Sequence, residues 1–469
     1  MKLIEYFSQQ DLDTIHATVL KVLKEKGVRF PYAPALDLFK KAGCRMDGDR
    51  VFFSPKLVES SIKKAPSSFS VYGRNQEKKV AVGGGDTVFI PVYGPPFIED
   101  LEGGRRDGAL GDFVNFVRLC HNSPVIQVTG GVMAEPTDVP VKKRGMEMVF
   151  ASLKYSDKPF MGAVLGREEA IHTINLAAMV MGGKDELAKK PPCLNLTGAA
   201  PPLAWDDKTL GAMMEYAAYG IPVFSNTLAI AGLNAPVTLE GALVIQTAEI
   251  LSGVVLIQLV REGAPLLFSA SSTCANMQNA TLCCGAPEMG IFTVANCQLA
   301  RYYGLPVRAG AGATDAKISD IQAGYETMMN LIMASLAGAD ILLCAAGSLD
   351  SYMLSSLDKF IIDEELCLMC QRIKRSQTIN ETKLAYEVID ACAYDSSFIA
   401  HMHTFDNFRK EFFISKLSTK DTYEEWIDKG RPAVVERARQ EWQLRLREYV
   451  QPEWDRQLEK KLRNYINSH

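Results

Sequence analysis

The segment that decides the fold runs from Gln322 to Glu365 and reads QAGYETMMNLIMASLAGADILLCAAGSLDSYMLSSLDKFIIDEE. A helical stretch is followed by the apolar run ILLCAAG, then by a glycine-containing polar turn and an acidic segment. A strand that ends in small and polar residues where a loop begins is typical of the mouth of a (β/α) barrel, where such folds assemble their chemistry. The segment therefore predicts a barrel and places its working end at the ends of the strands.

The same order of strand and helix recurs through most of the chain. The apolar runs that read as strands are PVIQVTGG (124–131), PFMGAVL (159–165), CLNLTGAA (193–200), PVFSNTLAIAG (222–232), PLLFSASS (265–272), PVRAGAGATD (306–315) and DILLCAAGSLD (340–350). Alternation of this kind at a spacing of about 30–40 residues predicts parallel pairing with right-handed crossovers. An eighth strand is expected either in KFIIDEEL (359–366) or in the VFIPVYG segment (88–94).

The expected fold is α/β, a (β/α)8 TIM-like barrel with an N-terminal helical and hairpin extension and C-terminal helices. We expect the extension over 1–107, the barrel over 108–370, and a C-terminal helical cap that completes the barrel over 371–469. An open doubly wound sheet is the alternative. The sequence has neither a GxGxxG opening a helix after the first strand nor a GxxxxGK[ST], which disfavours mononucleotide-binding α/β folds.

Composition narrows the class of protein. The chain has 469 residues, 47% of them hydrophobic, enough for a large core. A net charge of −4 gives no reason to expect nucleic acid or an anionic membrane as a partner. The 11 cysteines include several inside apolar runs, which indicates reduced, buried thiols. No run reaches the roughly 18 apolar residues of a transmembrane helix, and the N-terminus lacks a signal-peptide core. We expect a cytoplasmic enzyme.

Several segments, in order, resemble the trimethylamine methyltransferase-like family, in particular its members without pyrrolysine. They are YGPPFIED (93–100), GLNAPVTLEGALVIQTAEILSG (232–253), REGAPLLFS (261–269), GAPEMGIFTVANCQLARYYGLPVRAG (285–310), TDAKISDIQAGYETMMNLIMASLAGAD (314–340), GSLDS (347–351), FIIDEEL (360–366) and FIAHMHTFDNFRKEFF (398–413). The resemblance implies a barrel that takes a methyl group from a methylated amine and delivers it to Co(I) of a separate corrinoid protein. It also implies a homo-oligomer with no tightly bound cofactor of its own.

Pyrrolysine separates the substrates within this family. Trimethylamine enzymes carry it in the catalytic pocket, whereas this chain contains only ordinary residues. The resemblance therefore implies a small quaternary amine such as glycine betaine, proline betaine or carnitine. A quaternary nitrogen is already positively charged, so attack on its methyl carbon releases a neutral amine. The enzyme then needs mainly to hold that carbon in line with cobalt, which is catalysis by positioning.

A quaternary ammonium group has no N–H to donate, so its site is expected to combine aromatic faces with a carboxylate. Tyr93, Phe97 and Tyr352 are the candidate rings, because a cation over an aromatic face gains about 0.5–2 kcal/mol. Packing of each ring in the core is the alternative. A carboxylate on the substrate requires a cation, and Arg308 on the sixth strand is the candidate. Its alternative is an ion pair with Asp315 or Glu326.

The predicted catalytic residues are Glu326, Asp350 and Gln322. Gln322, Tyr325 and Glu326 share one helical face, which could place an amide, a ring and a carboxylate together in a site. The alternative is a helix that only packs on the barrel, with Glu326 in an ion pair with Arg308 or Lys317. Asp315 and Asp350 end strands at the expected mouth. The remaining predicted substrate-binding residues are Glu249, Tyr325, Gly347 and Ser348, where the glycine permits close approach of the backbone to a ligand.

Two other functions compete with methyl transfer from a quaternary amine. One is a zinc-dependent corrinoid methyltransferase for thiols or methanol, because Cys367 and Cys370 with His401 or His403 are suitable ligand types. The CxxC spacing reads as one apolar helix face, so we expect no metal here. The other is a barrel that binds quaternary amines without catalysis, since a cage of rings serves binding as well as turnover.

Overall fold

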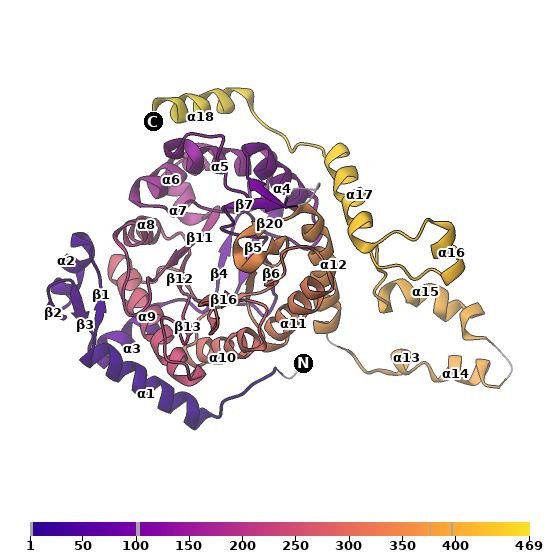
Figure 1. Cartoon of the computed structure of the whole chain (residues 1–469), viewed down its shortest axis with the longest axis horizontal. Helices are drawn as coiled ribbons and strands as arrows, with labels where there is room; N and C mark the ends of the chain where they lie inside the picture. Colours follow the sequence, from indigo (N-terminus) through magenta and orange to yellow (C-terminus); the bar gives the residue numbers. More distant parts are fainter. Residues whose placement is uncertain (1–2, 100–103, 376, 395–396) are drawn as a thin grey trace.

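The computed structural model describes residues 3–99, 104–375, 377–394 and 397–469. Its centre is an eight-stranded sheet in the order β6–β18–β17–β14–β12–β11–β10–β9, with every neighbouring pair parallel. An isolated parallel bridge between Phe89 and Ile126 joins its two edges. The sheet is therefore a closed barrel, seen end-on inside a ring of helices in Figure 1, and the predicted fold is confirmed.

Each barrel strand is followed along the chain by a helix of the outer ring. The strands are β6 (Val88–Phe89), β9 (Thr129–Gly130), β10 (Phe160–Met161), β11 (Cys193–Gly198), β12 (Val223–Thr227), β14 (Leu266–Ala270), β17 (Val307–Gly310) and β18 (Ile341–Leu343). The helices are α4 (Leu110–Asn122), α5 (Val141–Tyr155), α6 (Arg167–Met181), α8 (Asp207–Ala218), α9 (Leu239–Val260), α10 (Pro287–Tyr303), α11 (Ile321–Ala337) and α12 (Leu357–Lys374). The short α7 (Lys184–Lys189) follows α6.

Two details of the predicted boundaries need correction. The eighth strand is β6 in the VFIPVYG segment, so the barrel begins before residue 108 and the expected extension over 1–107 is too long. The alternative over 359–366 is wrong, because that segment lies inside α12. Two of its three acidic residues are buried against cations: Asp363 pairs with Lys359, and Glu364 pairs with Arg445. This pairing is not visible in the local sequence pattern.

The interior of the barrel is packed up to its mouth. Leu194, Phe224, Leu267 and Ile341 from four strands fill the lower layers. A hairpin of β4 (Phe69–Val71) and β5 (Val80–Val82) packs its valines beneath them. The hairpin is preceded by the N-terminal layer and carries the short helix η1 (Gln76–Lys78). The amino ends of the strands are therefore plugged, and only the carboxyl ends remain for a site.

The N-terminal layer packs on α9 from outside. It consists of α1 (Gln9–Glu25), β1 (Val28–Arg29), α2 (Ala33–Lys41), β2 (Arg45–Asp47), β3 (Arg50–Phe52) and α3 (Pro55–Lys64). Helices α1, α2 and α3 all contact α9. Among the described residues, α9 is the one helix whose length and composition would allow a membrane span, but 78% of that apolar window is buried within the protein. Its apolar character is therefore that of a core helix.

Two small sheets lie at the mouth of the barrel, at the carboxyl ends of its strands. One sheet is formed by β13 (Ile230–Ala231), β15 (Thr273–Asn276) and β16 (Thr281–Cys283), and another by β19 (Ser348–Leu349), β20 (Leu354–Ser355), β7 (Phe97–Glu99) and β8 (Arg105–Asp107). The 3-10 turn η2 (Asp350–Tyr352) lies between β19 and β20. These insertions come from the loops after β6, β12, β14 and β18, so they lie at the carboxyl ends of the barrel strands.

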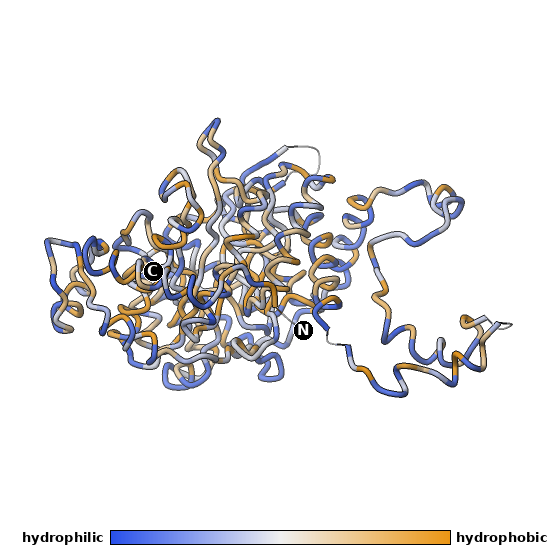
Figure 2. The backbone as a smooth tube through the Cα atoms, turned by 90° about the horizontal axis from the view of Figure 1, so that it is seen from below, coloured by the Kyte–Doolittle hydropathy of each residue, from blue (hydrophilic) through white to orange (hydrophobic). Residues whose placement is uncertain are grey.

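The C-terminal region lies outside the ring. An arm, defined as the described residues 377–394 and 397–428, leaves the end of α12 and largely stands off the barrel (Figures 1 and 2). Its stretch 411–418 returns to α12, where Glu411 O accepts from Arg372 and the Leu417 N–H donates to Glu365. It contains α13 (Glu381–Leu384), α14 (Tyr386–Cys392), η3 (Phe398–Ala400), α15 (Met402–Glu411) and α16 (Tyr423–Asp428). After it, α17 (Val434–Arg447) packs on α12 and α4, and α18 (Arg456–Ser468) packs on α5 and α6. Because α12 is already the eighth helix of the ring, these helices cover the barrel and do not complete it.

Candidate functional site

Polar and aromatic side chains from five strands meet at the mouth of the barrel. Arg308 lies on β17, Asn226 on β12 and Ser271 just after β14, while Tyr93 and Tyr352 follow β6 and β18. Arg308 is only 2% exposed, and its Nη1 donates hydrogen bonds to Ser271 Oγ (2.5 Å) and Asn226 Oδ1 (3.4 Å). The other four side chains are half-buried, whereas the guanidinium is buried among them.

Arg308 has no counter-charge in the part of the chain that the structure describes. Its partners are neutral, and its Nε is buried without a hydrogen-bond partner. The alternative of an ion pair with Asp315 or Glu326 is wrong, because both carboxylates are bonded elsewhere. Burial lowers the pKa of the guanidinium from its ordinary value. An unpaired buried charge is costly in a folded protein. Its presence at the barrel mouth is the arrangement expected of a site that receives an anion.

Tyr93 and Tyr352 both lie close enough to this guanidinium to feel its charge, and both pack against the same core cluster. Burial raises the pKa of both phenols, and the charge of Arg308 opposes that rise in each. The Tyr352 hydroxyl is buried without a partner. The two predicted rings are therefore brought together, and their contact with a cation stays a prediction. Phe97 is elsewhere: its ring already carries the guanidinium of Arg105, 4.4 Å from the ring centroid, within the sheet that contains β7.

A strained turn positions Tyr352. Asp350, Ser351 and Tyr352 have φ values of 50°, 51° and 72°, a left-handed conformation that costs roughly 1–2 kcal/mol per non-glycine residue. Hydrogen bonds from Asp350 N to Ala316 O (2.8 Å) and from Ser351 N to Thr314 O (2.9 Å) hold the turn on the neighbouring loop. Strain of this kind concentrates at functional sites. The predicted residue Asp350 contributes an ion pair with Lys317 at 3.0 Å.

Asp315 ties three loops of the mouth together. Its carboxylate accepts hydrogen bonds from Ser351 Oγ (2.6 Å), Cys284 N (2.7 Å) and Gly285 N (2.9 Å). These donors come from the loops after β14 and β18, while Asp315 itself follows β17. With those bonds made, the geometry supports a positioning role for Asp315 in place of the predicted direct contact with substrate.

Glu326 and Gln322 meet on one face of α11, as the spacing predicts. Glu326 is 6% exposed, and its carboxylate accepts hydrogen bonds from Thr314 Oγ1 (2.5 Å), Asp315 N (2.8 Å) and Gln322 Nε2 (2.9 Å). Both carboxylate oxygens are therefore used in holding the loop that carries Asp315. Tyr325, the third residue of that predicted face, points outward and is exposed. The structure gives this group a supporting position beside the mouth.

Three other predicted residues lie behind the barrel wall. Glu249 on α9 is fully buried and accepts hydrogen bonds from Leu203 N (2.6 Å) and Thr227 Oγ1, and burial raises its pKa to about 7. Gly347 donates its N–H to Asp363 (2.9 Å) and faces the rings of α4 and α12, and Ser348 is fully buried. Glu249 and Gly347 therefore have partners within the protein, whereas the Ser348 hydroxyl is buried without one. The ligand contacts of these three residues stay predictions.

A cavity that the sequence did not reveal opens beside Tyr93. It has a volume of about 220 Å³. Its walls include Tyr93, Met148, Val149, Met161, Val164 and Glu169. The Oε2 atom of Glu169 is buried without a hydrogen-bond partner, and burial raises the pKa of this carboxyl to about 7. In the sequence, Glu169 belongs to the GREEAIH segment, where paired acids at a helix start are unremarkable. Only the folded arrangement of α5 and α6 distinguishes it.

The residues considered as zinc ligands are not gathered. Among the described residues, no group of three or more His, Cys, Asp or Glu side chains is placed to hold a metal ion. Cys367 and Cys370 face the core from α12, and burial raises the pKa of both thiols. His401 and His403 lie in the arm, where His401 Nδ1 accepts the His403 N–H at 3.1 Å. The arrangement gives the zinc-dependent alternative no support.

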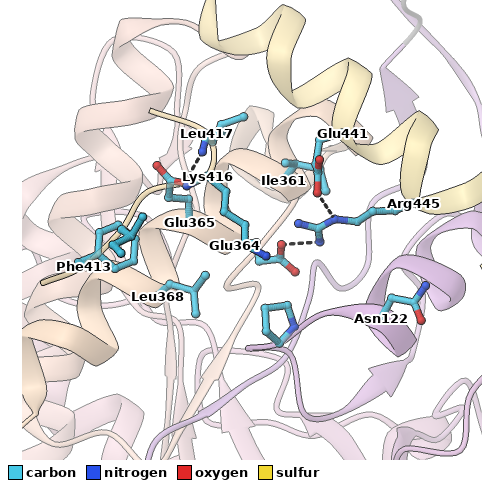
Figure 3. A pocket seen from close by; sticks show the side chains of 12 residues that line it. Asn122, Ile361, Glu364, Glu365, Leu368, Phe413, Lys416, Leu417, Glu441 and Arg445 are labelled. Carbon is cyan, nitrogen blue, oxygen red and sulfur yellow. Dashed lines mark hydrogen bonds and ion pairs between the residues drawn. The ribbon is translucent and has the colours of Figure 1, made fainter. Parts of the chain in front are cut away.

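A second cavity, of about 290 Å³, lies between α12 and the C-terminal region (Figure 3). Arg445 bridges Glu364 (2.6 Å) and Glu441 (2.7 Å) across it, and Glu365 accepts the Leu417 N–H at 2.8 Å (Figure 3). Its lining reaches Asn122 and Pro124, which precede β9 at the amino ends of the strands. The bonds around this cavity hold the C-terminal segment on the barrel, far from the mouth.

Comparison with known proteins identifies the family of the chain and agrees with its fold. The family described as trimethylamine methyltransferase (MTTB) matches residues 1–469. The chain is 38% identical to a glycine betaine methyltransferase of Desulfitobacterium hafniense (strain Y51), covering 98% of this chain and 96% of that protein. It is 30% identical to a proline betaine:corrinoid methyltransferase of Eubacterium limosum, covering 98% and 97%. The crystal structure of the Methanosarcina barkeri monomethylamine methyltransferase (MtmB) superposes with a TM-score of 0.52 at 13% identity, covering 95% and 96%, which shows a shared fold.

Proposed function

The chain belongs to the trimethylamine methyltransferase (MTTB) family, and from that premise we propose that it transfers a methyl group from a small betaine-type quaternary amine to Co(I) of a corrinoid carried by a separate protein. The relatives named for glycine betaine and proline betaine support this reaction class. Within the structure, the observation that carries it is the buried, unpaired guanidinium of Arg308 at the barrel mouth. A betaine has both a permanent cation and a carboxylate, and a trimethylamine molecule has no carboxylate for such a residue to bind.

The reaction is a displacement at carbon. The bond between nitrogen and the methyl carbon breaks, nitrogen keeps the electron pair, and a neutral tertiary amine leaves. The cobalt of the acceptor supplies the pair for the new carbon–cobalt bond, so no proton has to move on the protein. What the chain must supply is a fixed orientation of the substrate and exclusion of water, which can lower a barrier by about 7–11 kcal/mol in favourable cases.

Arg308 is suited to orient the substrate through its carboxylate. A guanidinium presents a planar fork of donors that matches a carboxylate, and such charge-assisted hydrogen bonds are stronger than neutral ones. The orphaned Nε and the unpartnered Tyr352 hydroxyl are donors without acceptors in the ligand-free arrangement. A carboxylate bound here would satisfy both. The strained turn at Asp350–Tyr352 then serves to hold the phenol in place.

The partner protein is proposed to dock on the rim of the mouth, because its cobalt has to reach the methyl carbon there. The loops after six barrel strands expose large apolar side chains. This apolar rim consists of Val141, Leu165, Leu233, Val237, Met277, Ile318, Ile321, Tyr325 and Met353. Extended apolar surface around an opening is typical of a protein-binding site. The rim therefore fits a corrinoid protein that approaches along the barrel axis.

A homo-oligomer and a cytoplasmic location complete the proposal. The arm exposes apolar side chains in each of its helices, and it leaves the barrel beside Gly85 and Thr87, where Lys374 binds at the amino end of β6. That end is opposite to the mouth, so a second copy of the chain suits the arm better than the corrinoid protein does. The free thiols of all 11 cysteines support a reducing compartment.

The test is methyl transfer by the purified chain. It is incubated with Co(I) cobalamin or the cognate corrinoid protein and with glycine betaine, proline betaine, carnitine or trimethylamine. We expect the absorption spectrum of methyl-cobalt and release of the demethylated amine with one of the betaines. Calorimetric binding without transfer would establish the non-catalytic barrel instead. Transfer from methanol or a thiol with stoichiometric zinc would establish the zinc-dependent alternative.

A further inference from the structure

We propose that the cavity between α5, α6 and Tyr93 binds the methylated ammonium group, and that Glu169 is the anion that balances its charge. The identity of the ligand rests on the proposed function, while the cation site itself rests on the geometry. The cavity, of about 220 Å³, is smaller than the roughly 300–1,000 Å³ of sites for drug-sized molecules. Its size thus suits a compact cation.

The walls of the cavity match methyl groups. Met148, Val149, Met161 and Val164 present apolar side chains, and Tyr93 presents an aromatic ring. Methionine sulfur and aromatic faces are polarisable surfaces, and an aromatic face attracts a cation directly. A quaternary ammonium group spreads its charge over carbon-bound hydrogens and donates no strong hydrogen bond. It therefore loses little when it enters a site that offers no neutral acceptors.

Glu169 supplies the opposite charge without a competing partner. Among the described residues no donor reaches its buried Oε2. The nearby cation Arg144 is already paired with Glu135, with Nη1 and Oε1 2.9 Å apart. A buried carboxylate without donors or a cation is unstable in the ionised form. A ligand that brings positive charge and no hydrogen-bond requirement would remove this deficit, which is the property of a quaternary ammonium group.

Glycines make the room for these groups. A Cβ on Gly145 would lie 1.8 Å from Glu169 Oε2, and a Cβ on Gly131 would lie 2.5 Å from the Tyr93 ring. Gly145 is the first buried residue along α5 and does not have a positive φ, so its backbone alone does not call for glycine. Glycine inside a helix costs about 1 kcal/mol relative to alanine. The space taken by the Glu169 carboxylate is the structural reason for that glycine.

The cavity and Arg308 are connected through Tyr93. The ring of Tyr93 lines the cavity, and the charge of Arg308 acts on its phenol. In this proposal Glu169 binds the ammonium group of a zwitterion and Arg308 binds its carboxylate, so one substrate needs two charged residues of opposite sign.

Binding at this site is expected to depend on pH. The groups that face Glu169 are Glu168 on its own helix, Glu135 and Arg144 from the β9–α5 region, and Tyr216 from α8. Burial and the two neighbouring carboxylates raise the pKa of Glu169 to about 7. A bound cation favours the ionised form, so binding below about pH 7 releases a proton. Affinity for the cation is therefore expected to rise with pH and to level off above that value.

The experiment measures binding of tetramethylammonium and of glycine betaine to the full chain by titration calorimetry. We expect Glu169→Gln to weaken both by about tenfold or more, which corresponds to loss of about 1.4 kcal/mol. Glu168→Gln, an exposed neighbour on the same helix, is the matched control and is expected to cause no weakening. Equal thermal unfolding of the variants shows that they are folded. Because tetramethylammonium has no carboxylate, a loss of affinity for it cannot be caused by a change at Arg308.

The outcomes separate the cation site from the proposed reaction. Glu169-dependent binding of tetramethylammonium without methyl transfer from any betaine would uphold the site and overturn the reaction. Methyl transfer by Glu169→Gln with an unchanged KM would uphold the reaction and overturn the site. Failure of the wild-type chain to bind tetramethylammonium, or equal binding by wild type and Glu169→Gln, would also overturn the site.

Discussion

Gly145 on α5 faces the carboxylate of Glu169 on α6 so closely that a Cβ at position 145 would lie 1.8 Å from Oε2 and 2.8 Å from the carboxyl carbon. The obstructed atoms are the end of a flexible side chain, so Gly145→Ala should fold while pushing the carboxylate out of the cavity. We expect affinity for tetramethylammonium to fall about as far as in Glu169→Gln, although every charge is retained. Titration calorimetry on the variant measures this loss.

The matched control is Gly324→Ala on α11, where nothing lies within 4 Å of the added Cβ. This substitution should leave affinity unchanged and raise the free energy of unfolding by up to about 1 kcal/mol, because alanine is the better helix former. Unaltered binding of tetramethylammonium by Gly145→Ala would mean that the placement of Glu169 is irrelevant to the cation.

Arg308 should act on the carboxylate of the substrate and not on its cation. Arg308→Met removes a buried guanidinium that has only neutral partners, so no protein carboxylate is left unpaired. We expect the KM for glycine betaine to rise by roughly thirtyfold or more, from the loss of about 2 kcal/mol or more of charge-assisted hydrogen bonding. Binding of tetramethylammonium should persist. Arg308→Lys keeps the charge without the planar fork and should give an intermediate loss; equal losses for both ligands would contradict the assignment.

The apolar rim predicts a difference between two methyl acceptors. Ile321 is 87% exposed at the start of α11, and Val237 is exposed in the loop before α9. Ile321→Lys and Val237→Lys should each raise the KM for the corrinoid protein by about tenfold, since burial of one such side chain contributes about 1.5–3 kcal/mol. Transfer to free cobalamin should not change, because cobalamin does not need the rim.

Val450→Lys supplies the control for the rim, since Val450 is similarly exposed but lies on the C-terminal segment outside the barrel. Steady-state kinetics with both acceptors measure the effect. A parallel decrease with free cobalamin would show that the rim substitutions damage the site itself and not the docking surface.

The barrel was predictable because its strands are buried on both faces. Such strands form continuous apolar runs between helices, often opened by proline, and seven of them were visible in this way. The eighth, β6, has two residues in a segment rich in glycine and proline, so the pattern left two possibilities. The segment 359–366 could be taken for a strand because its sequence gave no sign that its acidic residues are buried in a helix. In the structure Asp363 is paired with Lys359 of the same helix, and Glu364 is paired with Arg445 of α17.

Only some residues of the site could be predicted from the sequence. Arg308 could be selected as a cation on a predicted strand and Tyr93 as a candidate ring, but the absence of an ion pair at Arg308 depends on where Asp315 and Glu326 make their hydrogen bonds. Glu326 has the right residue type and spacing for catalysis, yet the fold uses both of its oxygens in hydrogen bonds. Glu169 could be identified only from the packing of α5 against α6, because its distinguishing property is a buried carboxylate oxygen without a hydrogen-bond partner.

Glu249 should make stability depend on pH. Burial raises the pKa of its carboxyl to about 7 in the folded chain, compared with 4.5 for an ordinary glutamate. Between these values the folded chain keeps a proton that the unfolded chain has lost, so raising the pH favours unfolding. The stabilisation is complete below about pH 4.5 and is lost as the pH rises through about 7; its size is at most about 3 kcal/mol.

Denaturant unfolding of wild type and Glu249→Gln between pH 5 and 8 checks this dependence. Glutamine can keep both hydrogen bonds, to Leu203 N and to Thr227, without titrating. The difference in unfolding free energy between the two proteins should therefore change with pH in favour of the variant at the alkaline end. Glu240→Gln, exposed on the first turn of the same helix, should show no such difference; identical pH profiles for wild type and Glu249→Gln would refute the prediction.

The arm should hold two copies of the chain together. Its exposed apolar side chains are Ile379, Leu384, Tyr386, Ile389, Tyr394, Phe398, Ile399, Met402, Phe405, Phe412, Ile414, Tyr423 and Ile427. In the described part of the single chain these side chains are exposed, and Figure 2 shows most of the arm standing off the barrel. Phe405→Asp with Phe412→Asp places two charges at positions that are 61% and 67% exposed in the single chain, so the barrel should remain folded.

Sedimentation equilibrium should then show the mass of one chain for the double variant and a multiple of it for wild type. Each buried phenylalanine contributes about 1.5–3 kcal/mol to association, so the pair is enough to shift dissociation by roughly two orders of magnitude or more. Asp406→Lys changes the charge of a neighbouring exposed residue without touching an apolar contact and should leave the mass at the wild-type value. A monomeric wild-type chain would rule out the second copy, and loss of oligomers only in complexes with the corrinoid protein would assign the arm to that partner instead.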